Sequence, residues 1–294
     1  MYRIAILGCE NSHAKNFLTL IAEGNYPDIE VVGIYSDEPE AVQKLHDKFG
    51  VRIMADYGEL QGKLDGVMIT ARHGDNHYKY AKPYLNDGIP MFIDKPITCR
   101  EDEAIEFMNA AKSAGVRLCG GSTCAALQET LSLAEAVRTN ALGELRGGSL
   151  ACPIITDSPY GGFYFYAQHL IEVMTTIFGE EVLEILADGR QGAPTFIARY
   201  GQYNVTGTYV EKTGYYSASV YGSKSARSEL LSFTHDSFRH EMNDMLDLLR
   251  GGNMKKSYES FITPVFLMNT ILRSLESGRW EPVPEIRIQK EPSC

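Results

Sequence analysis

The alternation of short apolar runs with helical periodicity over residues 1 to 120 constrains the fold more than any other feature. Such alternation is typical of parallel strands joined by crossover helices. Strands are predicted at 3–7, 30–35, 66–70, 90–94 and 116–120, and helices at 14–23, 38–49, 76–86 and 101–114. Gly24, Gly50, Gly88 and Gly115 close these helices, as glycines commonly do. The region is therefore predicted to be an α/β domain with a doubly wound parallel sheet.

A different pattern begins at about residue 125. Helices are predicted at 125–139, 167–178, 236–250 and 262–277, a strand at 145–154, and hairpins across the aromatic and β-branched region 182–234. We place the domain boundary after residue 121 and expect residues 122–294 to form an α+β domain with a large open, mostly antiparallel sheet. Because a subunit contact would cover the exposed face of such a sheet, we expect a homodimer or homotetramer.

The charge balance argues against several classes of partner. With 38 acidic and 28 basic side chains the net charge is −10, which repels phosphate backbones and anionic membranes. We expect no nucleic-acid partner, no membrane partner and a cytoplasmic location, because neither a signal pattern nor a long apolar run is present. The six cysteines are scattered without a C-x-x-C pair. No metal site is predicted, since His73 and His77 have no partner at ligand spacing.

The turn from Gly8 to His13 follows the first predicted strand, where a dinucleotide-binding fold holds a pyrophosphate. Only the first glycine of G-x-G-x-x-G is present, because Glu10 and His13 replace the second and third. Asn11 and Ser12 are predicted to offer side-chain donors to a phosphate. The alternative is an ordinary turn in which one of them caps the following helix.

The second strand ends at Tyr35 and is followed by Ser36 and Asp37. Ser36 takes the position at which an acidic residue normally binds the adenine ribose, and Asp37 comes one residue later. Two interpretations remain open: NAD bound by Asp37, or NADP tolerated by Ser36. NAD is preferred, because no arginine stands beside Ser36 to bind a 2'-phosphate.

Asp94, Lys95 and Pro96 follow the fourth strand directly. Ligands of open α/β sheets bind beyond the carboxyl ends of the strands, so this tripeptide lies at the expected place. Pro96 biases Lys95 toward an extended backbone, which would hold the ammonium group in one direction. Lys95 could then hydrogen-bond a substrate oxygen and exchange its proton. The alternative is an ordinary surface lysine in a turn.

Several of these segments together resemble the Gfo/Idh/MocA family, named after glucose-fructose oxidoreductase and inositol dehydrogenase. The resemblance rests on the turn Gly8 to His13, the segment from Thr70 through His73 and His77, the tripeptide at Lys95, and the pair His169 and Glu172. The hairpin from Tyr215 to Lys224 and the segment from Phe238 to Arg250 also look like the substrate domain of that family. The order and spacing match over nearly the whole chain.

The resemblance implies an N-terminal Rossmann domain that binds NAD or NADP, and an oxidoreductase acting on sugars, inositols or polyols. Lys95 matches the lysine of the Glu-Lys-Pro motif of the family, with Asp94 in place of the glutamate. His169 matches the histidine that assists proton transfer. Residues assigned to the cofactor site are Gly8, Glu10, Asn11, Ser12, His13, Ser36, Asp37, Thr70, His73, His77, Asp94 and Lys95.

The chain departs from the family pattern before His169. The family commonly has an aspartate four residues ahead of the histidine, where this chain has Phe165. Tyr166 or Tyr164 is predicted to supply a hydroxyl to the substrate instead, although an aromatic run is more often packing. Glu172 is predicted either to orient His169 or to be a solvated charge.

Three functions are consistent with this sequence. The first is hydride transfer between the nicotinamide and a CH–OH carbon of a polyol-like substrate, with Lys95 and His169 as catalytic residues. The second is a non-catalytic protein that binds a nucleotide or sugar, suggested by the altered glycine turn and Phe165. The third is a lyase or hydrolase that uses tightly held NAD for transient oxidation.

Overall fold

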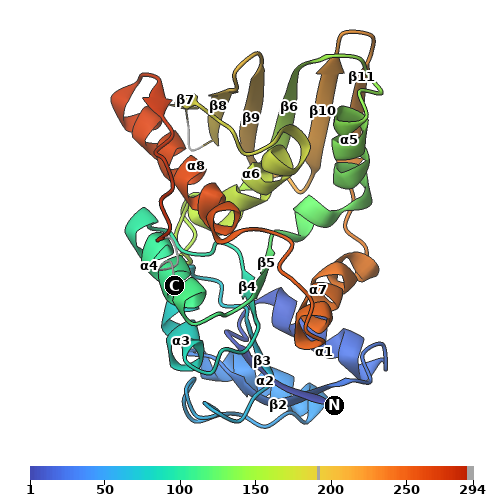
Figure 1. Ribbon diagram of the computed structural model, residues 1–294, viewed down its shortest axis with the longest axis vertical. Coiled ribbons are helices and arrows are strands. Elements are labelled where there is room, and N and C mark those ends of the chain that lie inside the picture. The colour runs from blue at the N-terminus through green and yellow to red at the C-terminus, as the bar shows by residue number, and fades with distance from the viewer. Residues whose placement is uncertain (191–192, 290–294) are drawn as a thin grey trace, which may run out of the picture. The chain divides into compact units, whose positions relative to one another are not determined.

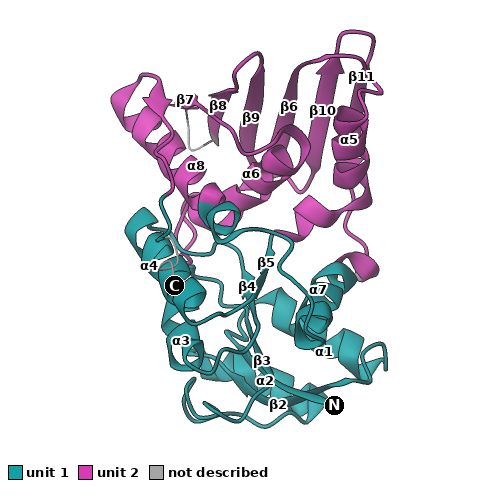
Figure 2. Cartoon of the chain, viewed as in Figure 1, with its two compact units in different colours: residues 1–121, 238–262, 287–294 teal, residues 122–237, 263–286 magenta. Residues whose placement is uncertain are grey.

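A computed structural model describes residues 1–190 and 193–289 of the chain (Figure 1). The chain divides into two compact units, which Figure 2 colours separately. Within the described residues, unit 1 contains 1–121, 238–262 and 287–289, and unit 2 contains 122–237 and 263–286. Each unit has its own sheet and its own hydrophobic core.

Unit 1 contains a five-stranded parallel sheet with the order β2-β1-β3-β4-β5. Helices connect successive strands, and the strand order reverses direction at β1 and β3, as a doubly wound fold requires. The strands are β1 (Tyr2–Leu7), β2 (Ile29–Tyr35), β3 (Gly66–Ile69), β4 (Met91–Asp94) and β5 (Leu118–Gly121). The helices are α1 (Ser12–Ala22), α2 (Pro39–Phe49), α3 (Asp75–Leu85) and α4 (Glu101–Ser113). The predicted α/β architecture is confirmed.

Helix α2 shows how local sequence sets these boundaries. Pro39 stands at the first turn, where its fixed φ suits a helix and its missing N–H costs nothing. Val42 and Leu45 face the core one turn apart, while the residues between them are polar. Gly50 ends the helix at a φ of 70°, a left-handed conformation that glycine adopts without strain.

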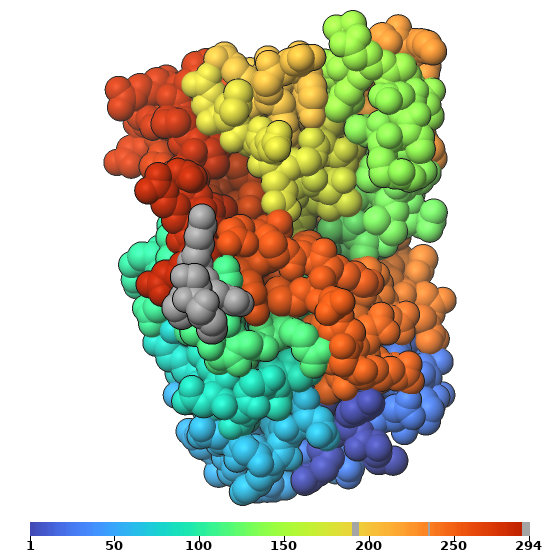
Figure 3. Space-filling view, viewed as in Figure 1, coloured from blue at the N-terminus to red at the C-terminus, as the bar shows by residue number. Residues whose placement is uncertain are grey.

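Unit 1 also contains helix α7 (Arg239–Leu249), which follows the short 3₁₀ turn η2 (His235–Phe238). Met242, Met245 and Leu248 of α7 pack into the same core as β1 and α1, because they recur on one face of the helix. In the space-filling view the orange residues of this helix lie against the blue N-terminal residues (Figure 3). The structure therefore differs from the continuous domain expected over residues 122–294.

Unit 2 contains a seven-stranded sheet with the order β11-β10-β6-β9-β8-β7-β12. Only the β6–β9 pair is parallel among its described pairings, so the sheet is mixed and mostly antiparallel, as expected. Its strands are β6 (Leu145–Ile154), β7 (Glu184–Arg190), β8 (Ala193–Arg199), β9 (Asn204–Glu211), β10 (Tyr216–Gly222), β11 (Ala226–Leu231) and β12 (Glu281–Pro282).

Three helices pack on the sheet of unit 2, preceded by the 3₁₀ turn η1 (Thr123–Ala126). They are α5 (Gln128–Arg138), α6 (Tyr164–Phe178) and residues 263–277 of α8 (Tyr258–Ser277), and Figure 1 shows all three helices in front of the sheet. The core between helices and sheet includes Leu170, Met174, Phe196, Tyr209 and Leu267. Tyr221 and Leu230, on neighbouring strands, remain exposed, so part of the sheet is left uncovered.

Across residues 1–190 and 193–289, none of the helices combines the length and the apolar character needed to cross a bilayer. The described cysteines, Cys9, Cys99, Cys119, Cys124 and Cys152, are buried and form no disulfide. Cys294 lies outside the described residues.

Candidate active site

The turn after β1 is shaped by Gly8. Its φ of +87° is in the left-handed region, and a Cβ added there would lie 2.2 Å from the backbone nitrogen of Ala71. The N–H groups of Gly8 and Cys9 both donate to the carbonyl of Tyr35. Thr70 adds a third connection, because its hydroxyl donates to the Gly8 carbonyl at 2.9 Å. A glycine is thus required where β1, β2 and β3 end together.

Asn11 occupies the N-cap position of α1, but its side chain makes no capping bond. Its Nδ2 donates instead to Oδ2 of Asp94 at 2.7 Å, which links the turn after β1 to the end of β4. The Ser12 hydroxyl donates to Oδ1 of Asn11 at 3.2 Å. The capping alternative is therefore wrong for Asn11, because the buried carboxylate is the stronger acceptor.

Asp94 is completely buried, and its oxygens are surrounded by protein donors. Besides Asn11 it accepts the backbone N–H of Lys95 at 2.7 Å, and Nδ1 of His13 lies 3.0 Å from its Oδ2. The other ring nitrogen of His13 lies 3.7 Å from Oε2 of Glu241 on α7. We call Asn11, His13, Asp94 and Glu241 the Asp94 cluster. Asp94, predicted as a cofactor residue, is buried inside this cluster and positions its neighbours.

His13 is held as a neutral ring. Burial lowers its pKa to about 3, and the charge of Lys95 acts in the same direction. The ring packs edge-on against Phe17 and Phe238, with centroids 5.8 and 5.2 Å away. His13 thus replaces the third glycine of the motif with a side chain that fills the space between α1 and α7.

Lys95 is the first residue after β4 and is buried. The Lys95–Pro96 peptide bond is cis. The backbone N–H of Lys95 donates to the carboxylate of Asp94, which fixes the backbone at this residue. A buried lysine at the carboxyl end of a central strand contradicts the alternative of an ordinary surface lysine.

Glu10 is the carboxylate that contacts Ser36. Its Oε2 accepts the Ser36 hydroxyl at 2.6 Å, and its Oε1 accepts the backbone N–H of Arg72 at 3.0 Å. Ser36 also accepts the N–H of Glu38 at the start of α2. Glu10 was included in the predicted cofactor site, but only as the residue that replaces the second glycine of the motif. Its contact with Ser36 requires the register between β1 and β2, which motif spacing does not give.

Asp37 lies next to Ser36 but faces solvent. Its carboxylate accepts the Tyr35 hydroxyl at 2.6 Å and the ammonium of Lys79 at 3.0 Å. The hydrogen bond from Tyr35, together with those from Tyr80 and Lys79, lowers the pKa of Asp37. Both acidic groups, Glu10 and Asp37, therefore lie close to the end of β2.

His77 is completely buried on α3 and connects two loops of unit 1. Its Nδ1 lies 2.6 Å from the carbonyl oxygen of Pro96, and its Nε2 lies 2.9 Å from that of Ala71. Burial lowers its pKa, while the charge of Asp94 opposes the shift. A neutral imidazole donates to one of these carbonyls at a time. His77 thus fixes the loop after β3 against the loop after β4.

In unit 2, His169 lies on α6 beside the first residue after β5. Its Nδ1 is 2.6 Å from the hydroxyl of Ser122 and 3.5 Å from the sulfur of Cys124. Glu172, one turn later on α6, accepts the backbone N–H of Ser122 at 2.8 Å. It also accepts Nε2 of Gln168 at 2.7 Å. Glu172 is buried, so the interpretation as a solvated charge is wrong.

Ser122 is the residue of this network that the sequence did not single out. The available signal was its position directly after the fifth parallel strand, where functional side chains of such sheets gather. What the sequence did show is Phe165 in place of the family aspartate, and Phe165 packs against Tyr160 and Tyr166. The polar neighbour of the His169 ring is thus the Ser122 hydroxyl, whereas the family commonly has a carboxylate.

The two predicted tyrosines have different surroundings. Tyr164 donates its hydroxyl to Oδ1 of Asn269 at 2.8 Å, which assigns it to the packing of α6 on α8. The ring centroid of Tyr166 lies 5.7 Å from that of His169, and the ring centroid of Tyr216 lies 5.9 Å from it. Tyr166 and Tyr216 also line a cavity of about 400 Å³ whose polar lining includes Asp157, Glu211 and Lys212. Two of the residues that line the cavity in unit 2 are therefore neighbours of the His169 ring.

A comparison with protein families agrees with this arrangement. Residues 2–122 match the Gfo/Idh/MocA profile, described as an oxidoreductase family with an NAD-binding Rossmann fold. Residues 2–122 are therefore similar to the Gfo/Idh/MocA family of oxidoreductases. The resemblance deduced from the turn at Gly8 and from the loops after β3 and β4 is confirmed over these residues. The α6 histidine lies outside the matched residues.

Solved structures show that the fold likeness extends over nearly the whole chain. A myo-inositol dehydrogenase from Corynebacterium glutamicum has a TM-score of 0.80 at 17% identity, covering 97% of this chain and 100% of that one. A scyllo-inositol dehydrogenase from Lactobacillus casei, with bound NAD(H) and scyllo-inositol, has a TM-score of 0.82 at 14% identity and covers 96% and 99%. At these identities the likeness is one of fold.

A curated relative comes from Amycolatopsis mediterranei (strain S699), and its name gives it as the oxidoreductase subunit of a UDP-kanosamine synthase. The two sequences are 25% identical over 215 residues. The match spans 68% of this chain and 59% of the relative, so a large part of the relative has no counterpart in the alignment.

Proposed function

We propose that this chain is an NAD-dependent dehydrogenase that transfers hydride between the nicotinamide and a CH–OH carbon of a sugar-, inositol- or polyol-like substrate. The observation that carries the proposal is the placement of Lys95. It is a buried lysine at the carboxyl end of β4, and its backbone N–H donates to the carboxylate of Asp94, which also accepts Asn11 of the glycine turn. The family match and the sugar- and inositol-related names of the similar proteins support the substrate class.

The residues of unit 1 fit a dinucleotide. The close approach of Gly8 to Ala71 keeps side chains out of the turn, and the first turn of α1 carries no acidic residue. The first N–H groups of a helix have no acceptor within the helix, and together with the helix dipole they favour an anionic phosphate there. Glu10 is turned toward Ser36 by two hydrogen bonds, which takes its charge away from the start of the helix. Bound NAD would supply the hydride acceptor and donor.

Lys95 and His169 would provide the proton chemistry. A lysine ammonium hydrogen-bonded to the substrate oxygen stabilises the negative charge that develops as the C–H bond breaks. His169 would receive the hydroxyl proton at Nε2, since its Nδ1 faces Ser122. Tyr166 would contact the substrate through its hydroxyl, because it lies beside both the His169 ring and the cavity.

The cavity in unit 2 suits a small polyhydroxylated molecule. Its volume of about 400 Å³ is in the usual range for small-molecule sites. Carboxylates of Asp157 and Glu211 accept hydrogen bonds from hydroxyl groups, and Lys212 donates them. Aromatic rings of Tyr166 and Tyr216 supply flat apolar surfaces for the C–H faces of a sugar ring.

NAD is the preferred cofactor in this proposal because of Glu10. Its carboxylate contacts Ser36, at the end of β2 where the adenine ribose binds in such folds. A carboxylate there accepts hydrogen bonds from ribose hydroxyls and repels a 2'-phosphate. Asp37 adds a second negative charge nearby.

Replacement of Lys95 with methionine tests the proposed function. In a screen of inositols, sugars and sugar nucleotides with NAD⁺, the wild type should reduce the cofactor with at least one of them. K95M should lower kcat by a factor of 10³ or more, which is roughly the rate enhancement that a positioned acid and the stabilisation of developing charge provide together. Its affinity for NADH should change little. K44M, on the exposed face of α2, is the matched control and should keep full activity.

Near-normal turnover of K95M would refute the assignment of Lys95. Saturable NADH binding without turnover of any compound in the screen would favour the non-catalytic alternative. Cofactor that copurifies and is reduced only transiently during turnover would favour the lyase or hydrolase alternative. The cytoplasmic location and the homodimeric or homotetrameric state remain predictions, to be checked by fractionation and by light scattering.

A further inference from the structure

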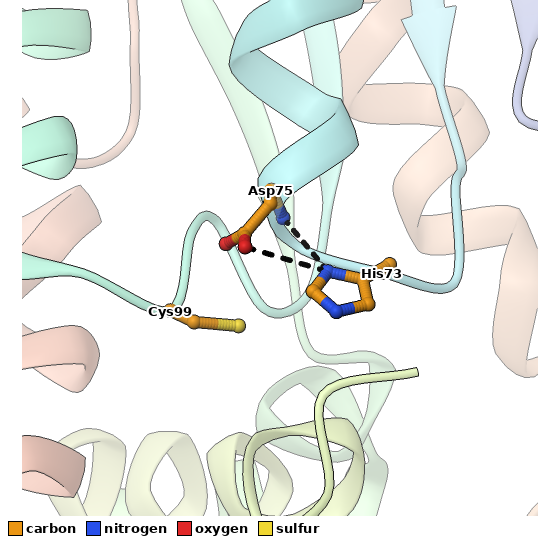
Figure 4. A group of neighbouring side chains, drawn as sticks. All are labelled: His73, Asp75 and Cys99. Carbon is orange, nitrogen blue, oxygen red and sulfur yellow. Dashed lines mark hydrogen bonds and ion pairs between the residues drawn. The ribbon is translucent and has the colours of Figure 1, made fainter. Parts of the chain in front are cut away.

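We propose that His73, Asp75 and Cys99 form a binding site for a divalent transition-metal ion, with zinc as the best match. His73 lies in the loop after β3, Asp75 is the first residue of α3, and Cys99 lies in the loop after β4 (Figure 4). The proposal is independent of the proposed dehydrogenase activity. It differs from the sequence-based expectation of no metal site, because Cys99 is distant from the other two along the chain.

The ligating atoms already lie close together. One ring nitrogen of His73, one carboxylate oxygen of Asp75 and the sulfur of Cys99 are all within 4.8 Å of one another. Nδ1 of His73 lies 3.9 Å from Oδ2 of Asp75. Figure 4 shows the Cys99 sulfur directed toward the His73 ring, with the Asp75 carboxylate beside both. Side-chain rotations that move these ligating atoms by about an ångström would allow all three to bind one ion, at metal–ligand distances of roughly 2.0–2.3 Å.

The segments after β3 and β4 that carry these side chains are held in place. His77, on the first turn of α3, contacts the carbonyl oxygens of Ala71 and Pro96, one from each segment. Gly74 packs so closely against Pro96 that an added Cβ would lie 2.9 Å from its ring. The backbone of the site is therefore preorganised, which removes much of the ordering cost of binding.

A second carboxylate, that of Glu103, provides an independent observation. Oε2 of Glu103, in the first turn of α4, is buried and accepts no hydrogen bond within the described part of the chain. The Glu103 carboxylate interacts electrostatically with both Asp75 and Cys99. A buried carboxylate oxygen without a donor is costly unless a cation or an ordered water compensates it. A metal ion at the three ligands would supply that positive charge.

Arg100 interacts electrostatically with Asp75 and Glu103 but makes its hydrogen bonds to a third carboxylate. Arg100 makes two hydrogen bonds to Asp102, at 3.0 and 2.7 Å, so its charge is already paired. The local excess of carboxylates around Asp75 thus favours a divalent cation.

The mixture of donors selects the kind of ion. One imidazole, one carboxylate and one thiolate are ligands that zinc accepts together, whereas magnesium and calcium prefer oxygen donors. On binding, the Cys99 thiol becomes a thiolate and its proton passes to solvent, so no oxidant or reductant is needed. Three protein ligands leave a fourth position for water. Because the ion would cross-link the segments after β3 and β4, it would stabilise the fold of unit 1.

Cobalt(II) substitution tests the site in the full-length chain. Protein freed of metal by dialysis against a chelator is titrated with Co²⁺, and Zn²⁺ affinity is measured by competition with a chromophoric chelator. We expect one ion per chain and a near-ultraviolet thiolate-to-cobalt charge-transfer band. Zinc should also raise the Tm, and the rise should continue with the logarithm of its concentration.

Three variants and one control assign the ligands. C99S should abolish the charge-transfer band and the zinc-dependent rise in Tm, and H73N and D75N should each lower zinc affinity at least tenfold. C119S, which removes another buried thiol of unit 1, should keep both signals. A folded wild type without the band, or a band and affinity unchanged in H73N and C99S, would overturn the proposal. Should C99S fail to fold, H73N and D75N decide the result.

Discussion

His13 in unit 1 and His169 in unit 2 are equally buried, with 5% and 6% of their surfaces exposed, yet their surroundings differ. The Nδ1 of His13 lies beside the carboxylate of Asp94, and Oε2 of Glu241 lies 3.7 Å from its other nitrogen. The Nδ1 of His169 lies against the hydroxyl of Ser122, and its ring contacts Tyr166 and Tyr216, which line a cavity. The comparison teaches that burial of a histidine does not distinguish structure from chemistry, whereas its hydrogen-bond partner and its neighbours do.

The largest effect that can test this comparison is the loss of activity in H169N. If His169 moves the substrate proton, kcat should fall by about 10²- to 10⁴-fold, the usual contribution of a general acid or base. Steady-state kinetics with the substrate found in the screen measures it. H46N, which changes a partly buried histidine on α2, should leave kcat unchanged. A kcat of H169N within a factor of three of wild type would contradict the catalytic role.

The matching test in unit 1 is D94A, which removes the carboxylate shared by Asn11, His13 and the Lys95 N–H. Three buried donors lose their acceptor, so the free energy of unfolding should fall by about 3–5 kcal/mol. Urea denaturation measures the change. D37A removes an exposed carboxylate of the same unit and should cost about 1 kcal/mol or less. Equal losses in the two variants would show that the Asp94 cluster is not the structural centre of unit 1.

The pH dependence of stability sharpens the comparison further. Burial lowers the pKa of His13 to about 3, so the unfolded chain, with an ordinary histidine pKa near 6.5, binds a proton that the folded chain does not. The stability from the neutral ring is complete above pH 6.5 and is lost as the pH falls toward 3. The expected slope is about 1.4 kcal/mol for each pH unit.

Urea unfolding of the wild type and H13Q between pH 7 and 5 measures this slope. In H13Q the slope of unfolding free energy against pH should be smaller than in the wild type by roughly the contribution of one proton. The slope that remains comes from other groups, including His77, whose pKa is also lowered. An unchanged slope in H13Q would show that another group is responsible.

The smallest expected effect concerns Ser122, a positioning residue that acts through His169. S122A should lower kcat about tenfold, because the Nδ1 partner that orients the ring is lost. It should also displace the pH profile of kcat, which a purely structural role would not do. S122T keeps the hydroxyl and should restore most of the activity. A parallel loss in S122A and S122T, with an unchanged pH profile, would assign Ser122 to packing.

Periodicity in the sequence was sufficient to predict the layers of each unit. The parallel strands of unit 1 and the helices between them were predicted close to their observed boundaries, because apolar runs and closing glycines are local signals. The place of α7 was not predicted. Its apolar face, with Met242 and Met245, fits any core of suitable shape, and only the three-dimensional contacts assign it to unit 1.

Residues of the candidate site were named from the sequence, but the contacts between them were not predicted. Lys95, His169 and Glu10 were named from spacing, whereas the bond from Glu10 to Ser36 and that from Ser122 to His169 join distant segments. Such pairs depend on strand register and on the order of strands in the sheet. A single sequence contains no direct measure of either, and Phe165 only indicated that a carboxylate partner was missing.

The division of unit 1 among three stretches of chain has a consequence for protein synthesis. As the nascent chain leaves the ribosome, β1 to β5 emerge first, but the core that Met242, Met245 and Leu248 complete is still open. The whole of residues 122–237 must be translated before α7 can cover it. The apolar surface beneath α7 is thus exposed for most of translation, at a stage when chaperones that recognise such surfaces can bind it.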